Sequence, residues 1–223
     1  MSPPVPLYPV VLRTEGRRCL VVGGGPVATR KVAELVRCGA LVTGVAPDVD
    51  SAIDALAETG GPGAVRVERR PYRNKEAADY RLVVTATGLV DIDRKVARDA
   101  DAAGIWVNSA DDAAHCTFIL PSVHRDGPVS VAVSTGGASP AMASWLRRRV
   151  AEILGDDLGV LAELLGEARH ELMTDGRPTT SVDWAALLDG PLPQLLRDGD
   201  IDGARALVAQ AAGLVPRSPP PAL

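Results

Sequence analysis

Aromatic residues, cysteines and long hydrophobic runs are all scarce in this chain, and each scarcity bears on function. Aromatic residues make up 3% of the sequence and Phe118 is the single phenylalanine, which argues against a stacking platform for single-stranded nucleic acid. The three cysteines are widely spaced, so neither a disulfide framework nor a zinc knuckle fits, and a reducing cytoplasm does. No apolar run reaches about 18 residues and the first residues lack a signal-peptide pattern, so we expect a cytoplasmic protein without a membrane span.

Charge is unevenly distributed along the 223 residues. The formal net charge is −4, yet residues 116–150 carry four arginines and a single acidic residue. Residues 151–223 carry 12 acidic and 5 basic side chains. A small basic segment on an acidic chain suits a small anionic ligand better than DNA, which requires a broad basic face, so we expect no nucleic-acid partner.

Apolar runs alternate with helical patterns over the first half of the chain. We expect strands at residues 19–22, 41–45, 65–69, 82–86 and 105–107, and helices at 27–38, 52–56 and 91–103. Gly39 and Gly104 follow two of these helices, at the position where glycine commonly ends a helix. The alternation predicts an α/β fold with a Rossmann-like, doubly wound parallel sheet over residues 1–115.

The pattern changes after about residue 115. Thr117–Leu120 and Val129–Val133 are predicted to pair as antiparallel strands, and Ser139 to cap a helix that runs to about Leu154. The strands within 116–135 have too little chain around them to bury both faces, so we expect a C2 homodimer that exchanges this segment, with 116–150 as the dimerisation segment. Helices at about 158–173, 182–188 and 201–212 predict a helical domain over 151–215, and the proline-rich residues 216–223 predict a disordered tail.

A glycine-rich turn lies between the first expected strand and the first helix. Residues 23–28 fit the pattern G-x-G-x-x-A, in which Gly23 makes a tight turn, Gly25 lets the backbone approach a pyrophosphate, and Ala28 lets the helix pack on the strand. The first N–H groups of the helix would then face the phosphates. The pattern predicts a dinucleotide site, the alternative being a turn without ligand; its expected contacts are Gly23, Gly25, Pro26, Val27 and Ala28.

Ligands in open α/β sheets bind at the carboxyl ends of strands, and two such ends carry candidate cofactor contacts. Asp48, which follows Pro47 after the second strand, lies near the usual spacing of the carboxylate that binds the ribose. Thr87, after the fourth strand, is placed to contact the nicotinamide half. For both Asp48 and Thr87 the alternative role is to cap the following helix.

The fifth strand ends in two carboxylates and a histidine, Asp111, Asp112 and His115. A carboxylate there could transfer protons, whereas the alternative is a solvated acidic loop. We expect His115 to pack or cap, since no metal-ligand cluster surrounds it and no metal site is expected.

A second glycine turn, residues 134–140, leads into a helix and could hold a carboxylate or phosphate. The arginines at 147–149 follow, in a run that is typical of a solvated face.

Taken in order, these motifs resemble the precorrin-2 dehydrogenase / sirohydrochlorin ferrochelatase family, which also forms the N-terminal module of multifunctional siroheme synthases. Residues 23–31 are similar to its G-G-G-x-V-A-x-R-K. Asn108 to Asp111, followed by residues 118–122, is similar to N-x-x-D…F-I-x-P-S, and residues 131–140 to V-A-V-S-[ST]-G-G-x-S-P. The resemblance covers about residues 6–155.

The resemblance implies NAD-dependent oxidation of the tetrapyrrole precorrin-2 to sirohydrochlorin, in siroheme biosynthesis, by an interlocked homodimer. Many members then insert Fe(II), which enters as a candidate substrate metal and not as a structural ion. The general base falls on Asp111 rather than Asp112, and a serine that is phosphorylated in some members falls on Thr135. The substrate contacts implied are Asn108, Ser134, Thr135, Gly136, Gly137 and Ser139.

Three points stay open in the sequence. The uroporphyrinogen methyltransferase domain of multifunctional members has no counterpart in these residues, so we expect a separate methyltransferase to supply the substrate. An NAD(H)-sensing regulatory module would share the Gly25 turn without requiring Asp111. An oxidoreductase of another small metabolite would usually show a Lys, Tyr or His catalyst, and none is well placed.

Overall fold

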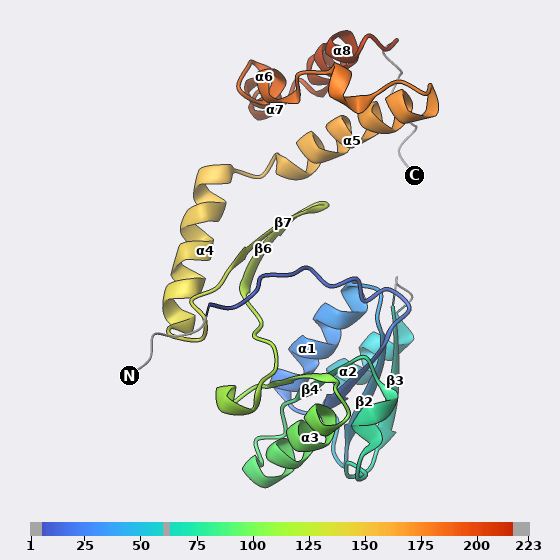
Figure 1. The fold of residues 1–223 in the computed structure, drawn as a ribbon, viewed down its shortest axis with the longest axis vertical. Helices are drawn as coiled ribbons and strands as arrows, with labels where there is room; N and C mark the ends of the chain where they lie inside the picture. Colours follow the sequence, from blue (N-terminus) through green and yellow to red (C-terminus); the bar gives the residue numbers. More distant parts are fainter. Residues whose placement is uncertain (1–5, 60–62, 216–223) are drawn as a thin grey trace. The chain divides into compact units, whose positions relative to one another are not determined.

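The computed structural model describes residues 6–59 and 63–215, which fall into two compact units, residues 1–120 and 121–223 (Figure 1). Each unit has its own secondary structure and its own hydrophobic core. The tail at 216–223, expected to be disordered, lies outside the described residues. We describe the two units separately.

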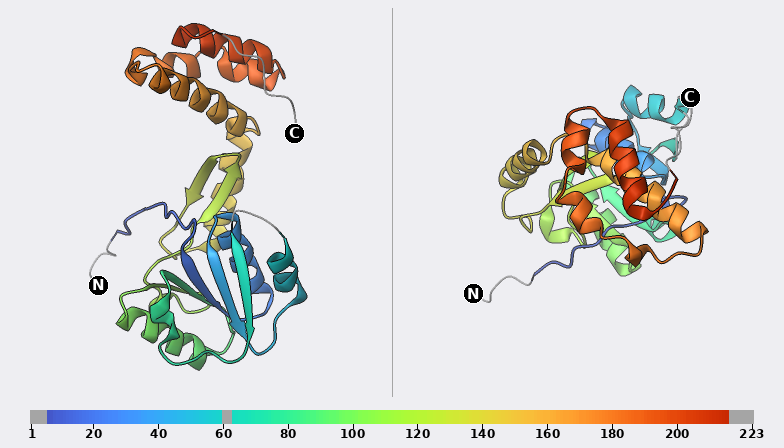
Figure 2. Two further views of the ribbon diagram at one scale, coloured as in Figure 1. Left: turned by 90° about the vertical axis from the view of Figure 1, so that its right-hand side faces the viewer. Right: turned by 90° about the horizontal axis from the view of Figure 1, so that it is seen from above.

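The first unit is built on a five-stranded parallel sheet with the order β3-β2-β1-β4-β5 (Figure 2). Its strands are β1 (Arg18–Val22), β2 (Leu41–Ala46), β3 (Ala64–Arg69), β4 (Leu82–Thr85) and β5 (Trp106–Ser109). Val22 pairs with Val45 on one side and with Thr85 on the other. The strand order therefore reverses between β1 and β4, which opens the crevice where doubly wound sheets bind ligands, and the predicted Rossmann-like fold is confirmed.

Helices cover both faces of this sheet because its central strands are apolar on both sides. In β1, Cys19 and Val21 pack with the buried stripe of α1 (Pro26–Arg37) and with α2 (Ser51–Glu58). Leu20 and Val22 face the other way and pack against α3 (Val90–Ala102). Two short 3-10 helices, η1 (Glu76–Asp79) and η2 (Ala113–His115), complete the unit. The arrangement is the one expected for a buried parallel sheet.

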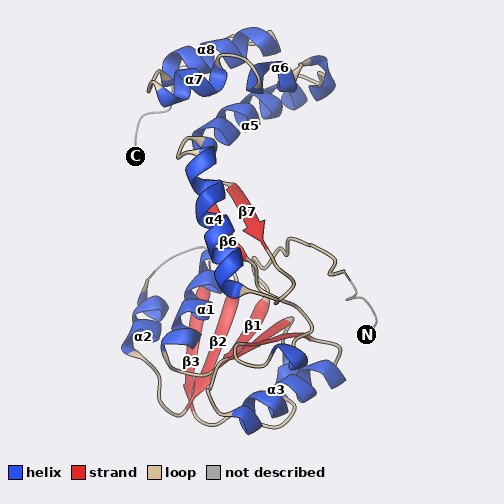
Figure 3. Ribbon diagram, turned by 90° about the vertical axis from the view of Figure 1, so that its left-hand side faces the viewer, coloured by secondary structure: helices blue, strands red, loops and turns tan. Residues whose placement is uncertain are grey.

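The second unit combines a hairpin with helices (Figure 3). Strands β6 (Ser122–Asp126) and β7 (Val129–Val133) pair antiparallel, and α4 (Pro140–Leu154) follows them. The remaining elements are α5 (Leu158–Thr174), η3 (Thr179–Ser181), α6 (Trp184–Leu188), α7 (Leu192–Arg197) and α8 (Ile201–Ala212). Leu172, Leu192 and Val208 are among the buried residues of a core shared by these helices, so the expectation that the C-terminal region is helical is confirmed.

Two expectations for this region were wrong. Thr117–Leu120 forms no strand, because the Thr117 N–H donates to the Val107 carbonyl at 2.8 Å and Thr117 Oγ1 accepts from the Val107 N–H at 2.7 Å. These bonds hold the segment at β5, and the hairpin begins only at Ser122. No helix was expected between residues 188 and 201, yet α7 forms there; prolines 191 and 193 are tolerated where a helix begins, since the first N–H groups have no partner within the helix.

Candidate active site

At the first two positions of the turn after β1, no residue larger than glycine fits. Gly23 has φ +132°, a region that L side chains rarely adopt, and a Cβ there would lie 2.3 Å from the Ala86 carbonyl oxygen. At Gly24 a Cβ would lie 1.8 Å from the Asp48 carbonyl oxygen. The turn therefore fits closely between the chain that follows β4 and the chain that follows β2. The sequence motif identified Gly23 but gave Gly24 no role.

Gly25, by contrast, faces open space. It is the N-cap of α1, and a Cβ added to it would meet no atom within 4 Å. No side chain caps this helix, so the N–H groups of Val27 and Ala28 in its first turn receive no capping acceptor. Ala28 is fully buried, which lets α1 lie close to the sheet. An open cradle at the positive end of a helix dipole fits a pyrophosphate, so the residues present suit a dinucleotide.

The chain after β2 is held against this glycine turn. The N–H of Asp50 donates to the Gly24 carbonyl at 2.8 Å. Asp50 Oδ1 accepts from the Ala52 N–H at 2.9 Å and so caps α2. The alternative role of Asp48 as the cap is therefore excluded. Asp48 is exposed, and its carboxylate has no partner among the described residues, which leaves it available to a ligand.

The loop after β4 contains a hydrogen-bonded network. Thr87 Oγ1 lies 2.8 Å from Asp93 Oδ1 and accepts from the Leu89 N–H at 3.0 Å. The Thr85 hydroxyl also donates to Asp93 Oδ1. Thr87 thus stabilises the turn before α3 but does not cap this helix, whose N-cap is Leu89 and which has no side-chain cap; its loop lies at the carboxyl edge of the sheet. Asp93 was missed, although its place on the buried face of α3 with Val96 and Ala100 was a signal in the sequence.

The two carboxylates after β5 differ in their surroundings. Asp112 Oδ2 lies 2.9 Å from His115 Nδ1 and 3.2 Å from Arg94 Nε. The His115 imidazole and then the Arg94 guanidinium hold the pKa of the Asp112 carboxyl below its usual range. Asp111 is exposed, and no hydrogen bond or ion pair joins its carboxylate to the described residues. Asp111 is therefore the carboxylate of this pair that remains available to take a proton.

Asn108 and Cys116 fix the loop that carries Asp111. Asn108 is buried, and its Nδ2 donates to the Phe118 carbonyl at 3.1 Å. Cys116 Sγ accepts from the Ser109 N–H at 3.1 Å. The amide nitrogen of Asn108 is thus engaged by the chain itself, and the role of Cys116 was not apparent from the sequence.

The second glycine turn belongs to the second unit, and its hydroxyls bond within the turn. Thr135 Oγ1 accepts from the Ser139 N–H at 3.0 Å, and Ser134 Oγ accepts from the Gly136 N–H at 3.1 Å. Ser139 Oγ caps α4 by accepting from the Met142 N–H at 3.2 Å, as predicted. Thr135 Oγ1 donates to the Ser139 carbonyl, whereas the Ser134 and Ser139 hydroxyls only accept in these bonds, so their O–H groups could still donate to an anion at this turn.

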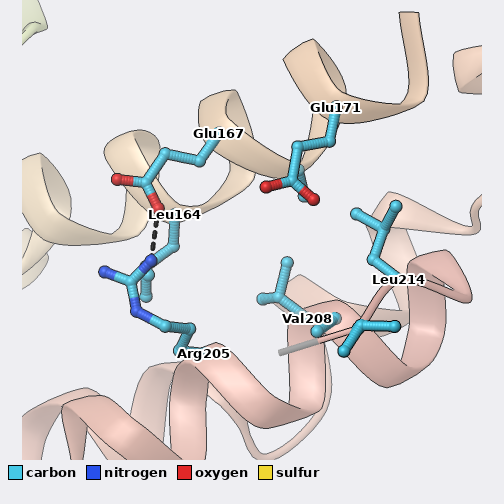
Figure 4. Close-up of a pocket in the computed structure, with 9 residues that line it drawn as sticks. Leu164, Glu167, Glu171, Arg205, Val208 and Leu214 are labelled. Carbon is cyan, nitrogen blue, oxygen red and sulfur yellow. Dashed lines mark hydrogen bonds and ion pairs between the residues drawn. The ribbon is translucent and has the colours of Figure 1, made fainter. Parts of the chain in front are cut away.

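A hollow between α5 and α8 of the second unit is too small for a cofactor (Figure 4). Arg205 forms an ion pair with Glu167 at its edge, and Leu164 and Val208 also line it. Its volume is about 40 Å³, which holds a few water molecules. Within residues 6–59 and 63–215, no group of three or more His, Cys, Asp or Glu could hold a metal ion, and no helix is long and apolar enough to cross a membrane.

Comparison with known proteins agrees with this geometry. A family model described as "Putative NAD(P)-binding" matches residues 10–122, which is half of the chain. The chain belongs to this NAD(P)-binding family. A second model, "Sirohaem biosynthesis protein central", matches residues 126–153. The resemblance to the N-terminal module of siroheme synthases, identified from the motifs, is confirmed.

Relatives of this NAD(P)-binding chain include several siroheme synthases. Those of Methylococcus capsulatus and Acinetobacter baylyi are 34% and 30% identical to it, over 96% and 92% of this chain and 45% of each relative. That of Thioalkalivibrio sulfidiphilus is 37% identical over 92% of this chain and 42% of its own. The chain thus spans less than half the length of these relatives. A solved structure titled "SirC, precorrin-2 dehydrogenase" shares the fold, with a TM-score of 0.68, 24% identity, and coverage of 93% of this chain and 99% of that one.

Proposed function

We propose that this chain oxidises precorrin-2 to sirohydrochlorin in siroheme biosynthesis, with NAD as the hydride acceptor. The observation that carries the proposal is the pairing of an open phosphate cradle at Gly25 with an unpartnered carboxylate, Asp111, at the carboxyl edge of one parallel sheet. The names of the siroheme synthase relatives and of the precorrin-2 dehydrogenase with the same fold support the choice of substrate.

The cofactor side of the site is assigned to the glycine turn and the two loops beside it. The N–H groups of Val27 and Ala28 would hold the pyrophosphate, and Pro26 opens the helix. Asp48 would accept hydrogen bonds from the ribose hydroxyls, and its negative charge would disfavour the 2′-phosphate of NADP. When bound, NAD supplies the acceptor for the hydride that leaves the macrocycle.

Asp111 is assigned as the acceptor of the proton that leaves precorrin-2. The oxidation removes a hydride and a proton from precorrin-2, and an exposed carboxylate without a partner can accept that proton. In the further reaction that we propose for the same site, Fe(II) enters the macrocycle as a substrate and displaces two pyrrole N–H protons. Asp111 would again be the acceptor.

The substrate side is assigned to Asn108, which shapes the Asp111 loop, and to the second glycine turn. Precorrin-2 carries eight carboxylates, and residues 116–150 carry four arginines against one acidic residue. Gly136 and Gly137 lie before the N-terminus of the 15-residue helix α4, whose dipole favours an anion. Ser134, Thr135 and Ser139 would hold this turn in shape.

We also propose a second copy of this chain as a partner. In the described part of the second unit, Ala143 is the one buried residue of α4, while Trp145 is 51% and Ile153 78% exposed. The β6–β7 hairpin likewise has no fully buried residue. A C2 dimer would cover these apolar side chains. A uroporphyrinogen methyltransferase that supplies precorrin-2 is the other proposed partner.

An anaerobic assay tests the proposal. The purified chain is mixed with precorrin-2 and NAD, the formation of sirohydrochlorin is followed by absorbance, and Fe(II) is then added. We expect turnover that depends on both NAD and enzyme. NAD binding without turnover would indicate a sensing module, and oxidation of other metabolites alone would indicate a different oxidoreductase. Oxidation without iron insertion would limit the activity to the dehydrogenase step.

A further inference from the structure

The carboxylate of Asp93 is buried between α3 and the sheet, at a position where an apolar residue would ordinarily pack. Asp93 is 5% exposed and is the charged member of the buried polar residues that the structure describes. It occupies the first turn of α3, on the face that buries Val96 and Ala97 against the sheet. Burial of a carboxylate costs free energy unless hydrogen bonds compensate it, so its partners indicate what it does.

All of the hydrogen bonds that the structure gives to Asp93 come from the end of β4 and the loop after it. Its Oδ1 accepts from the hydroxyls of Thr85 and Thr87 and, at 3.2 Å, from the Thr87 N–H. Thr87 Oγ1 in turn accepts from the Leu89 N–H at 3.0 Å. One carboxylate oxygen thus fixes the conformation of residues 85–89.

This segment forms the side of the crevice opposite the glycine turn. The Ala86 N–H donates to the Val22 carbonyl at 2.8 Å, and Thr85 pairs with Val22 in the sheet register. The Ala86 carbonyl is the atom that a Cβ at Gly23 would strike at 2.3 Å. A shift of residues 86–87 would therefore move one wall of the cofactor cradle.

A further polar residue lies on the same face of the sheet. Val83 and Val107 pack on the α3 side, so by strand alternation Thr85 and Ser109 face that side as well. Thr85 pairs with Ser109 in the register, and the buried Ser109 Oγ has no hydrogen-bond partner among the described residues. Thr85, Asp93 and Ser109 thus place three buried polar side chains together on the α3 face, at the ends of β4 and β5 that border the crevice.

We propose that Asp93 is a positioning residue for the cofactor site: it holds the Thr85–Leu89 segment in the conformation that completes the crevice beside the glycine turn. The proposal rests on the proposed NAD site and adds a residue that does not touch the cofactor. Under this proposal, the affinity for NAD(H) depends on how well the loop that carries Thr87 is held in one conformation.

The test compares Asp93→Ala with Asp91→Ala, because alanine removes the acceptor oxygen that asparagine would keep. Asp91 lies in the same helical turn but is exposed and has no partner among the described residues, so its replacement removes the same carboxylate without disturbing the network. We expect Asp93→Ala to weaken NADH binding, measured by fluorescence titration of the full chain, by about 10-fold or more, and Asp91→Ala by less than about 2-fold. Amide exchange of Thr87 and Leu89 should quicken selectively in Asp93→Ala.

A double-mutant cycle with Thr87→Val separates positioning from general stability. If Asp93 acts through Thr87, the losses of NADH affinity in the two single variants should not add. The double variant should then bind NADH as tightly as the single variant with the lower affinity. Additive losses, unchanged NADH affinity in Asp93→Ala, or exchange that quickens equally in β1 and β2 would overturn the proposal. If Asp93→Ala fails to fold, Thr87→Val alone must weaken NADH binding and quicken exchange at Leu89, or the proposal is wrong.

These readouts need no tetrapyrrole, so they are distinguishable from a failure of the proposed function. A wild-type chain that binds NADH without oxidising precorrin-2 refutes the function and leaves the role of Asp93 standing. A wild-type chain without affinity for NAD(H) overturns both.

Discussion

Replacing Gly25 by valine should abolish NAD binding while the fold survives. The backbone of Gly25 has φ −86° and ψ −174°, which is extended and open to a β-branched residue. A Cβ there would meet no atom within 4 Å, so the substitution places its first side-chain carbon in open space in the free protein. It would instead fill the space above the first turn of α1, where the pyrophosphate is proposed to lie.

The magnitudes of the two effects differ enough to be separated. Valine is a poorer N-cap than glycine, so Gly25→Val should lower the free energy of unfolding by about 1 kcal/mol or less. Occlusion of the cradle should reduce NAD affinity by at least about 100-fold, or about 2.7 kcal/mol.

Gly24→Ala provides the matched control. Its Cβ would lie 1.8 Å from the Asp48 carbonyl oxygen, so the β2 loop must move. That displacement should cost about 1–3 kcal/mol of stability, which is the usual range for overpacking. Urea denaturation measures the stability of both variants, and isothermal calorimetry measures NAD binding. Wild-type NAD affinity in Gly25→Val, or unchanged stability in Gly24→Ala, would refute the reasoning about this turn.

Three further predictions follow from individual sites. Asp48→Ala should weaken NAD binding by about 1–2 kcal/mol in calorimetry if the carboxylate holds the ribose, and unchanged affinity would remove it from the site. Light scattering at micromolar concentration should show a homodimer, and a monomer would contradict the proposed assembly. Burial raises the pKa of the Cys19 thiol to about 11, so thiolate is about a thousandth of it at pH 8 and thiol reagents should spare Cys19 until the protein unfolds.

A further prediction concerns pH. The pKa of Asp112 is lowered in the folded chain, so its contacts with His115 and Arg94 stabilise the loop above the ordinary aspartate pKa. That stabilisation is lost as the pH falls through the lowered value. NMR titration of the Asp112 carboxyl should give a midpoint below that of an unstructured aspartate, and an ordinary midpoint would contradict the contacts.

Much of the first unit was predictable because its local signals agree with its tertiary structure. Apolar runs gave four of the five strands, the alternation of polar and apolar residues gave β3, and the spacing of Ala28, Val32 and Val36 gave α1. The glycine motif predicted the turn between β1 and α1 because the backbone geometry there requires glycine at position 23. Thr117–Leu120 misled because its apolar residues indicated a strand, whereas none of the four residues is buried and the segment is bonded to β5 through Thr117.

The candidate site depended more on structure. Sequence spacing brought Asp111 and Asp112 to the same edge, while the contacts of Asp112 with His115 and Arg94 distinguish the engaged carboxylate from the available one. Arg94 lies 18 positions from Asp112, so no local pattern could have revealed this pair. The choice between ribose binding and capping for Asp48 likewise depended on the observation that Asp50 caps α2.

The most direct test of the proposed function is the rate of precorrin-2 oxidation by Asp111→Asn. The substitution keeps size and hydrogen-bonding capacity but removes the basic oxygen, so the rate should fall by about 10²–10⁴-fold, the usual range for a positioned general base. NADH affinity should be unchanged, and Asp112→Asn should lose far less, because its carboxylate is already engaged by His115 and Arg94. An Asp111→Asn enzyme that oxidises precorrin-2 at the wild-type rate would contradict the proposed function of this carboxylate.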